Sequence, residues 1–136
     1  MNSINSDIIR SIFDELQIAT TLDEDGDLRL CLSADENFPY DVVIYVMVNN
    51  NQLSFAAGAM DYTPAADLYH LANKHNCNNI LPVAVVRDGN IRMECSFLLD
   101  EEVSKEYIVN NCIRLPISQI WKAFCDIEKE QSLMVK

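Results

Sequence analysis

The sequence Asp41-Val42-Val43-Ile44-Tyr45-Val46-Met47-Val48, followed by Asn49-Asn50-Asn51 and by residues 52–60, is the most clearly patterned part of this chain. Residues 42–48 are apolar at odd and even positions alike. This is typical of an interior strand, because successive side chains point to opposite faces of a sheet. The three asparagines predict a turn into a second strand at 52–60. Residues 56–59 are small, so we expect another element to pack closely against them.

Turn residues on either side of this stretch predict two more pairs of strands. The acidic sequence Asp23-Glu24-Asp25-Gly26-Asp27 predicts a hairpin turn, since glycine tolerates the positive φ that a tight turn needs. Asp88-Gly89-Asn90 is a strong hairpin signal between β-rich segments. The predicted arms of these hairpins are residues 18–22, 28–32, 81–87 and 91–98.

Apolar residues at helical spacing predict a helix at 6–16, with Ser6 or Ser3 as its cap. A second helix is predicted at about 64–76, because Thr63 suits a cap and proline suits the first helical turn. This second helix is the expected neighbour of the small residues at 56–59.

The C-terminal part of the chain is also predicted to be helical. Pro116 lacks an amide hydrogen and restricts Leu115, which predicts a break between helices near 101–112 and 116–130. From Gln131 the chain is expected to fray. The whole order predicts one α+β domain over 1–136, with an ordered core at about 4–130 and helices around an antiparallel sheet.

Composition and charge narrow the class of protein. The chain has 49% hydrophobic residues with only three glycines and four prolines, which is ordinary for a globular domain. Its net charge is −11 and its sequence pI is about 4.4. The negative electrostatic field of this charge repels phosphate groups, so we expect neither nucleic acid nor an anionic membrane as a partner. The excess of acidic residues keeps the protein soluble or, alternatively, gives it a preference for basic partners.

The five cysteines are Cys31, Cys77, Cys95, Cys112 and Cys125. Their odd number and wide spacing fit neither a disulfide framework nor a zinc ribbon, so they are interpreted as small core residues in a reducing compartment. The N-terminus lacks the features of a signal peptide, and no stretch has the length of a membrane-spanning helix. We therefore expect a cytoplasmic protein.

Two groups of residues suggest a metal site, and both are weak candidates. Aligning Gly26 with the turn glycine of an EF-hand puts Thr21 and Leu32 at the first and last ligand positions, so a solvated turn is the favoured interpretation of residues 23–27. His70, His75 and Cys77, with Cys112 or Cys125, offer soft ligands, but histidines five residues apart on a helix point in different directions. We predict no metal and no cofactor.

Catalysis also lacks a convincing set of residues. His75 and Cys77 are close only in sequence, and the adjacent carboxylates at 14–15, 35–36 and 101–102 lie among polar positions where no desolvated acid is expected. Trp121, which we expect beside Tyr69, Tyr107 and Phe124, is interpreted as a core residue, with an anchor for a partner as the alternative. No catalytic residue is predicted, so the protein is expected not to be an enzyme.

The order of elements resembles that of the YbjN-like family, often labelled bacterial sensory transduction regulators, whose fold is similar to that of type III secretion chaperones. The resemblance is carried by the acidic hairpin 22–28, the paired strands 42–59, the helical sequence 65–73 and the stretch Gly89 to Asp100, which is followed by Val103-Ser104-Lys105-Glu106. It covers nearly the whole chain.

The resemblance implies a non-enzymatic regulator or binding protein with no agreed catalytic residues. Its structural relatives are small acidic homodimers that hold an extended client segment on apolar patches, so it also implies a homodimer with a protein client. Two hypotheses follow for this chain. One is a regulator or chaperone-like module that binds a partner protein through apolar surface. The alternative is a ligand-binding protein or enzyme whose site is assembled from distant residues, around Ala56 to Ala59.

Overall fold

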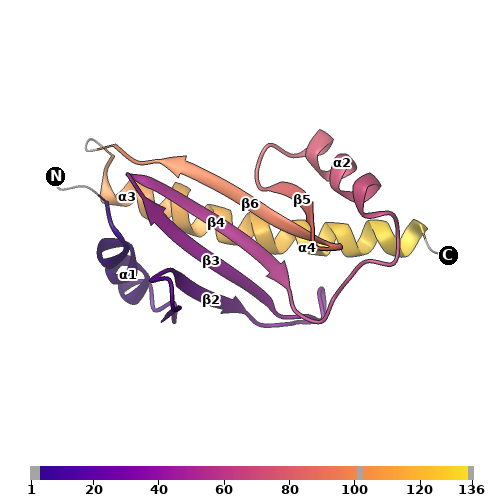
Figure 1. Ribbon diagram of the computed structural model, residues 1–136, viewed down its shortest axis with the longest axis horizontal. Coiled ribbons are helices and arrows are strands. Elements are labelled where there is room, and N and C mark those ends of the chain that lie inside the picture. Colours follow the sequence, from indigo (N-terminus) through magenta and orange to yellow (C-terminus); the bar gives the residue numbers. More distant parts are fainter. Residues whose placement is uncertain (1–3, 101–102, 135–136) are drawn as a thin grey trace.

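The computed structural model describes residues 4–100 and 103–134, and within them it contains one antiparallel sheet of six strands with helices (Figure 1). The α+β class and the predicted order of elements are confirmed. The elements are α1 (Ser6–Glu15), β1 (Thr21–Leu22), β2 (Leu28–Leu32), β3 (Val42–Asn49), β4 (Gln52–Ala59), α2 (Leu68–Asn78), β5 (Val83–Arg87), β6 (Asn90–Leu98), α3 (Lys105–Tyr107), the π-helical η1 (Ile108–Arg114) and α4 (Leu115–Met134).

The strand order is β1-β2-β3-β4-β6-β5, so the predicted interior strand, β3, does lie inside the sheet beside β4. The turn between them uses Asn50 and Asn51, whose φ angles are 50° and 65°. Asparagine tolerates this left-handed region better than most residues, which explains the run of asparagines. Asp88 and Gly89, with φ of 52° and 75°, form the second predicted hairpin turn in the same way.

One face of the sheet carries the core. The strand registers place Leu30, Ile44, Ala57 and Met93 in one row across four strands, and all four side chains are buried. The long helix α4 crosses this face behind the sheet (Figure 1). Burial of these apolar side chains against the helices is the main source of stability.

An aromatic cluster joins the core to the end of the sheet. Phe38, in the loop before β3, is fully buried and lies 5.1 Å from the ring of Tyr62 and 5.7 Å from that of Trp121, both edge to face. Tyr62 donates a short hydrogen bond to Glu128 of α4. The cluster therefore packs α4, through Trp121 and Glu128, against the loop before β3 and the loop after β4.

The second helix does not cover the small residues of β4, contrary to prediction. It begins at Leu68 rather than at Pro64, because the carboxylate of Asp67 accepts the amides of Tyr69 and His70 and caps the helix there. It packs on β5 and α4. Of the small residues, those on the core side face α4, and those on the other side face open space.

The predicted break at Pro116 is also wrong, since η1 runs into α4 without interruption. The amide of Leu115 donates to the carbonyl of Asn110, five residues back, so the widened π turn ends just before the proline. Pro116 then lies in the first turn of α4, where a missing amide is tolerated. The helix continues to Met134 and does not fray at Gln131, whose side chain accepts the amide of Ala65.

The first helix and first strand differ from prediction at their ends. Asn5 caps α1 by accepting the amide of Ile8, in place of Ser6, while Ser3 lies outside the described residues. The predicted arm at 18–22 shortens to Thr21–Leu22. Ile18 instead closes α1, because its amide donates to the carbonyl of Phe13 across a left-handed Gln17.

Candidate functional site

A groove of about 400 Å³ lies where the C-terminal half of β6 runs on past the end of β5. Its three walls are the connection from α2 to β5, the strand β6, and the junction of η1 with α4. Apolar side chains from all three line it, including Ile80, Leu81, Cys95, Phe97 and Leu115. No charged residue lines the groove among the residues that the structure describes, and its polar groups are the amides of Asn78, Asn79, Asn111 and Gln119, so most of its lining is apolar.

β6 has an unpaired edge beside this groove. The N–H and C=O groups of Ala84 in β5 point away from the sheet and bond the side chain of Asn76. Met93 lies opposite Ala84 in the register, so the N–H and C=O groups of Met93 point away from β5 and toward β4. Main-chain direction alternates along a strand, and therefore Ser96 and Leu98 point their N–H and C=O groups outward. β5 has ended by this point, at Val83 opposite Glu94. Within residues 4–100 and 103–134, no strand pairs with this edge.

Large apolar side chains surround the groove and are exposed. Ile80 is 90% exposed, Leu115 48% and Leu81 40%. Scattered exposed apolar residues are ordinary, but a group of them beside an apolar groove and an open strand edge is typical of an interaction site.

The connection from α2 to β5 is held in place by polar contacts from α2. One ring nitrogen of the buried His75, Nε2, is 2.8 Å from the carbonyl oxygen of Pro82, and the side chain of Asn79 donates to the carbonyl of His75 at 2.9 Å. These bonds hold the wall formed by Ile80 and Leu81 against the sheet.

Cys95 brings the only thiol to the described lining of the groove. Burial in apolar surroundings raises the pKa of this thiol to about 11. At neutral pH the group is a protonated thiol, which is a poor nucleophile. Cys95 therefore contributes apolar surface to the groove.

The acidic turn that suggested calcium is organised by its own main chain. Oδ1 of Asp23 accepts the amides of Asp25 and Asp27, each at 2.9 Å, and this pattern stabilises the turn. Oxygen atoms of Asp23, Asp25 and Asp27 lie within 4.8 Å of one another. Partial burial and the two neighbouring carboxylates raise the pKa of Asp27. The local contacts are those of a hairpin turn, the interpretation favoured from the sequence.

The histidines and cysteines do not gather into a metal site. In the described part of the chain, the acidic turn is the only group of three or more possible metal ligands. Both ring nitrogens of His75 lie against Pro82 and Asn79, while His70 and Cys77 are exposed. Three of the five cysteines are buried as predicted, but Cys31 and Cys77 are exposed, because each lies on the outer side of its strand or helix.

The remaining candidates are dispersed. The carboxylates at 14–15 and 35–36 are exposed, and Glu15 forms an ion pair with Lys105 at 2.6 Å, while 101–102 lie outside the described residues. Trp121 is half-buried against Phe38, as the core interpretation requires, but Tyr69 and Tyr107 are 73% and 51% exposed. These two tyrosines do not share its packing site.

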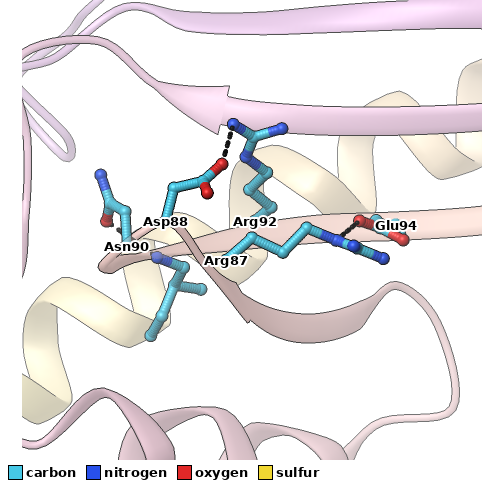
Figure 2. A network of polar contacts seen from close by, with 6 residues as sticks. Arg87, Asp88, Asn90, Arg92 and Glu94 are labelled. Atoms are coloured by element: carbon cyan, nitrogen blue, oxygen red, sulfur yellow. Dashed lines mark hydrogen bonds and ion pairs between the residues drawn. The ribbon is translucent and has the colours of Figure 1, made fainter.

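A second hollow, of about 420 Å³, lies on the face of the sheet opposite the core. Its floor is formed by Ala56 and Gly58, and arginines from β2, β5 and β6 stand around it. Figure 2 shows two of them, Arg87 and Arg92, on the β5–β6 hairpin with Asp88 and Glu94. The small residues Ala56 and Gly58, which were predicted to pack closely against another element, therefore form the floor of an open hollow.

Sequence reasoning missed the groove because it predicted hairpin arms of nearly equal length. In the structure β5 has five residues and β6 has nine. Pro82 was the available signal, since a proline has no N–H for a sheet ladder and is usually found at a strand end.

The fold and these two sites define a small α+β protein with an open sheet edge. Comparison with protein families, with curated proteins and with solved structures finds no match. The resemblance to the YbjN-like family therefore stays a prediction. In the described residues, no helix has both the length and the apolar character needed to cross a bilayer.

Proposed function

We propose that this protein is a non-enzymatic binding module that holds an extended segment of a partner protein along the free edge of β6. The observation that carries the proposal is the position of an apolar groove directly beside unpaired main-chain groups. An added strand satisfies such groups and also places alternate side chains in pockets beside the sheet.

The geometry supports a particular way of binding. The main chain of the segment pairs with Ser96 and Leu98, whose own groups point outward. Every second side chain of the segment then points to the helix side of the sheet, toward Phe97 and Leu115. The segment is accordingly apolar at alternate positions.

Charge supports a basic partner. The chain carries −11 overall, while the groove itself is lined by uncharged residues among those described. Apolar side chains in the groove and basic residues flanking the segment suit both features. The YbjN-like resemblance agrees with a regulator or chaperone-like role, and the free, exposed thiols of Cys31 and Cys77 suit a reducing cytoplasm.

Binding of selected peptides tests the proposal. Peptides are selected from a random phage-displayed library, and their affinity is measured by fluorescence polarisation for the wild type and for Ile80→Asp. Because Ile80 is 90% exposed, the substitution leaves the core intact. The matched control is Leu133→Asp, at the other end of α4, where the side chain is 63% exposed.

We expect selected peptides to be apolar at alternate positions and to lose affinity about tenfold or more with Ile80→Asp, since a charge is placed in an apolar site. Leu133→Asp is expected to bind like the wild type. Equal affinity for the two variants contradicts the proposal.

Hydrogen exchange tests the strand edge itself. In the free protein the amides of Ser96 and Leu98 face solvent and exchange quickly, and a bound strand protects them. Cys95 and Phe97 direct their amides to β4, so they serve as internal references. A peptide that binds without slowing Ser96 and Leu98 contradicts addition to this edge.

A second copy of the chain competes for the same edge. Two β6 strands related by a two-fold axis pair antiparallel, which would give the homodimer predicted from the sequence. Light scattering measures the oligomeric state of the wild type and of Ile80→Asp. A dimer that Ile80→Asp converts to monomer would assign the edge to self-association, and a monomer that binds peptide assigns it to a partner.

A further inference from the structure

The hollow on the open face of the sheet is a second candidate site, separate from the groove. Its floor is open because Ala56 has a small side chain and Gly58 has none, and a Cβ built on Gly58 meets no atom within 4 Å. Tyr45, 40% exposed, and Met60, 46% exposed, stand at its sides. The hollow is a shallow, open surface rather than an enclosed cavity.

The charge of this hollow is opposite to that of the whole chain. Three of the five arginines in the sequence, Arg29, Arg87 and Arg92, line it, against one lining carboxylate, Asp88, and the adjacent Glu94, which pairs with Arg87. The chain as a whole carries −11. A local basic surface on an acidic protein is a recognition feature, because electrostatic complementarity selects the partner.

The guanidinium groups are available to a ligand. Arg29 makes no ion pair within residues 4–100 and 103–134. Arg92 lies 3.6 Å from Asp88, which is 87% exposed, and Arg87 bonds Glu94 through Nε at 2.9 Å (Figure 2). Exposed pairs of this kind are weak, and bonding through Nε leaves the other nitrogens of Arg87 free.

The arrangement of the arginines specifies the shape of the ligand. Arg29 is on β2 and Arg92 is on β6, three strand spacings away, and the register places Arg29 opposite Glu94, two residues from Arg92, so their Cα atoms lie about 16 Å apart. Two carboxylates four residues apart on an extended chain are separated by about 13 Å and point to the same side, so both lie within reach of the long arginine side chains.

From this match we infer that the open sheet face binds an acidic, extended segment of a partner protein, with one carboxylate at Arg29 and another at Arg92. Arginine suits this role because its planar fork binds carboxylates through two parallel hydrogen bonds. The segment lies across the strands, over the floor formed by Ala56 and Gly58. The inference does not depend on the groove beside β6.

Two synthetic peptides test the inference by NMR titration of the isotope-labelled protein at low ionic strength. Both are flexible sequences of serine and glycine with two glutamates, which are four positions apart in one peptide and adjacent in the other. A third peptide carries glutamines in place of the spaced glutamates. We expect the spaced glutamates to shift the amide signals of Ala56 and Gly58, and the other two peptides to bind at least about tenfold more weakly.

Charge variants of the protein complete the experiment. Arg29→Gln and Arg92→Gln are each expected to weaken binding of the spaced peptide about tenfold, since each removes a charged hydrogen-bonding partner. Arg10→Gln, which removes the same charge from the exposed side of α1, is the matched control. Equal binding of the glutamine peptide or of the adjacent-glutamate peptide overturns the inference. So does an equal loss with Arg10→Gln, which would indicate a general charge effect.

Discussion

The side chain of Asn76 forms two hydrogen bonds with the main chain of Ala84: its Oδ1 accepts the Ala84 amide at 2.7 Å, and its Nδ2 donates to the Ala84 carbonyl at 2.9 Å. Asn76 thus takes the place of a neighbouring strand at the edge of β5. Open sheet edges promote uncontrolled association, and proteins commonly cover them. This contact closes one part of the edge and leaves the adjoining part of β6 open.

Replacing Asn76 with alanine is expected to destabilise the protein by about 1 to 3 kcal/mol, because both main-chain groups of Ala84 lose their partner. Urea denaturation measures the change in the free energy of unfolding. Asn73→Ala is the control, since Asn73 is an exposed neighbour on α2 that makes no main-chain contact with β5. A loss no larger than that of the control would mean that water replaces the Asn76 contacts without cost.

Tyr62 gives the protein a sensitivity to alkaline pH. Burial, together with its hydrogen bond to Glu128, raises the pKa of Tyr62 well above the usual value. Above about pH 10 the unfolded chain therefore releases the phenolic proton while the folded chain keeps it, and stability falls as pH rises. Tyr62→Phe is expected to reduce this loss, although at pH 8 it costs about 1 kcal/mol for the missing hydrogen bond.

Urea denaturation at pH 8 and near pH 10.5 tests the role of Tyr62. Tyr69→Phe serves as the control because Tyr69 is 73% exposed. If Tyr62→Phe loses as much stability between the two pH values as the wild type does, another group is responsible.

Asp27 is expected to limit stability at neutral pH. Partial burial raises its pKa, and the charges of Asp23 and Asp25 add to the effect. A raised carboxyl pKa means that the folded chain binds the proton more tightly than the unfolded chain, so this contribution to stability improves as pH falls. Asp27→Asn should therefore raise Tm at pH 7, and the gain should shrink on acidification.

Thermal unfolding of Asp27→Asn across the acidic and neutral range tests this prediction. Glu36→Gln, which removes one charge from an exposed loop residue, corrects for the change in net charge. A gain that is the same for both variants at every pH would assign the effect to net charge rather than to the turn.

Local signals in the sequence predicted the sheet well. Asp88-Gly89 and Asn50-Asn51 adopt the left-handed conformations that their residue types favour, so both turns follow from nearest neighbours. The alternation of residues 91–97 likewise predicts Ile91, Met93, Cys95 and Phe97 on the core face: the first three are buried, and Phe97 is half-buried against the core and lines the groove.

The errors arose where distant contacts override local preference. Pro64 and Thr63 form a good helix start in isolation, but the amide of Ala65 is taken by Gln131 from the far end of the chain. The groove depends on a difference in length between β5 and β6, and the basic hollow depends on strands that are distant in sequence. Pro82 marks the end of β5, and the small residues at 56–59 mark the floor of the hollow, but neither local pattern predicts the length difference or the arginines around the floor.

Gly58 provides a last prediction, which links stability to the open face. Its φ lies outside the left-handed region and a Cβ there meets no atom within 4 Å, so a β-branched side chain fits the strand and projects into the hollow. Gly58→Thr is expected to raise the free energy of unfolding by about 0.5 to 1 kcal/mol, measured by urea denaturation, because glycine weakens a strand interior. Gly26→Thr is the control: it has the same open space but a φ of 83°, so it should destabilise the acidic turn. Because the new side chain covers the floor between the arginines, Gly58→Thr should also weaken binding of the spaced-glutamate peptide while the fold becomes more stable. Unchanged affinity would show that the acidic segment does not lie over this floor.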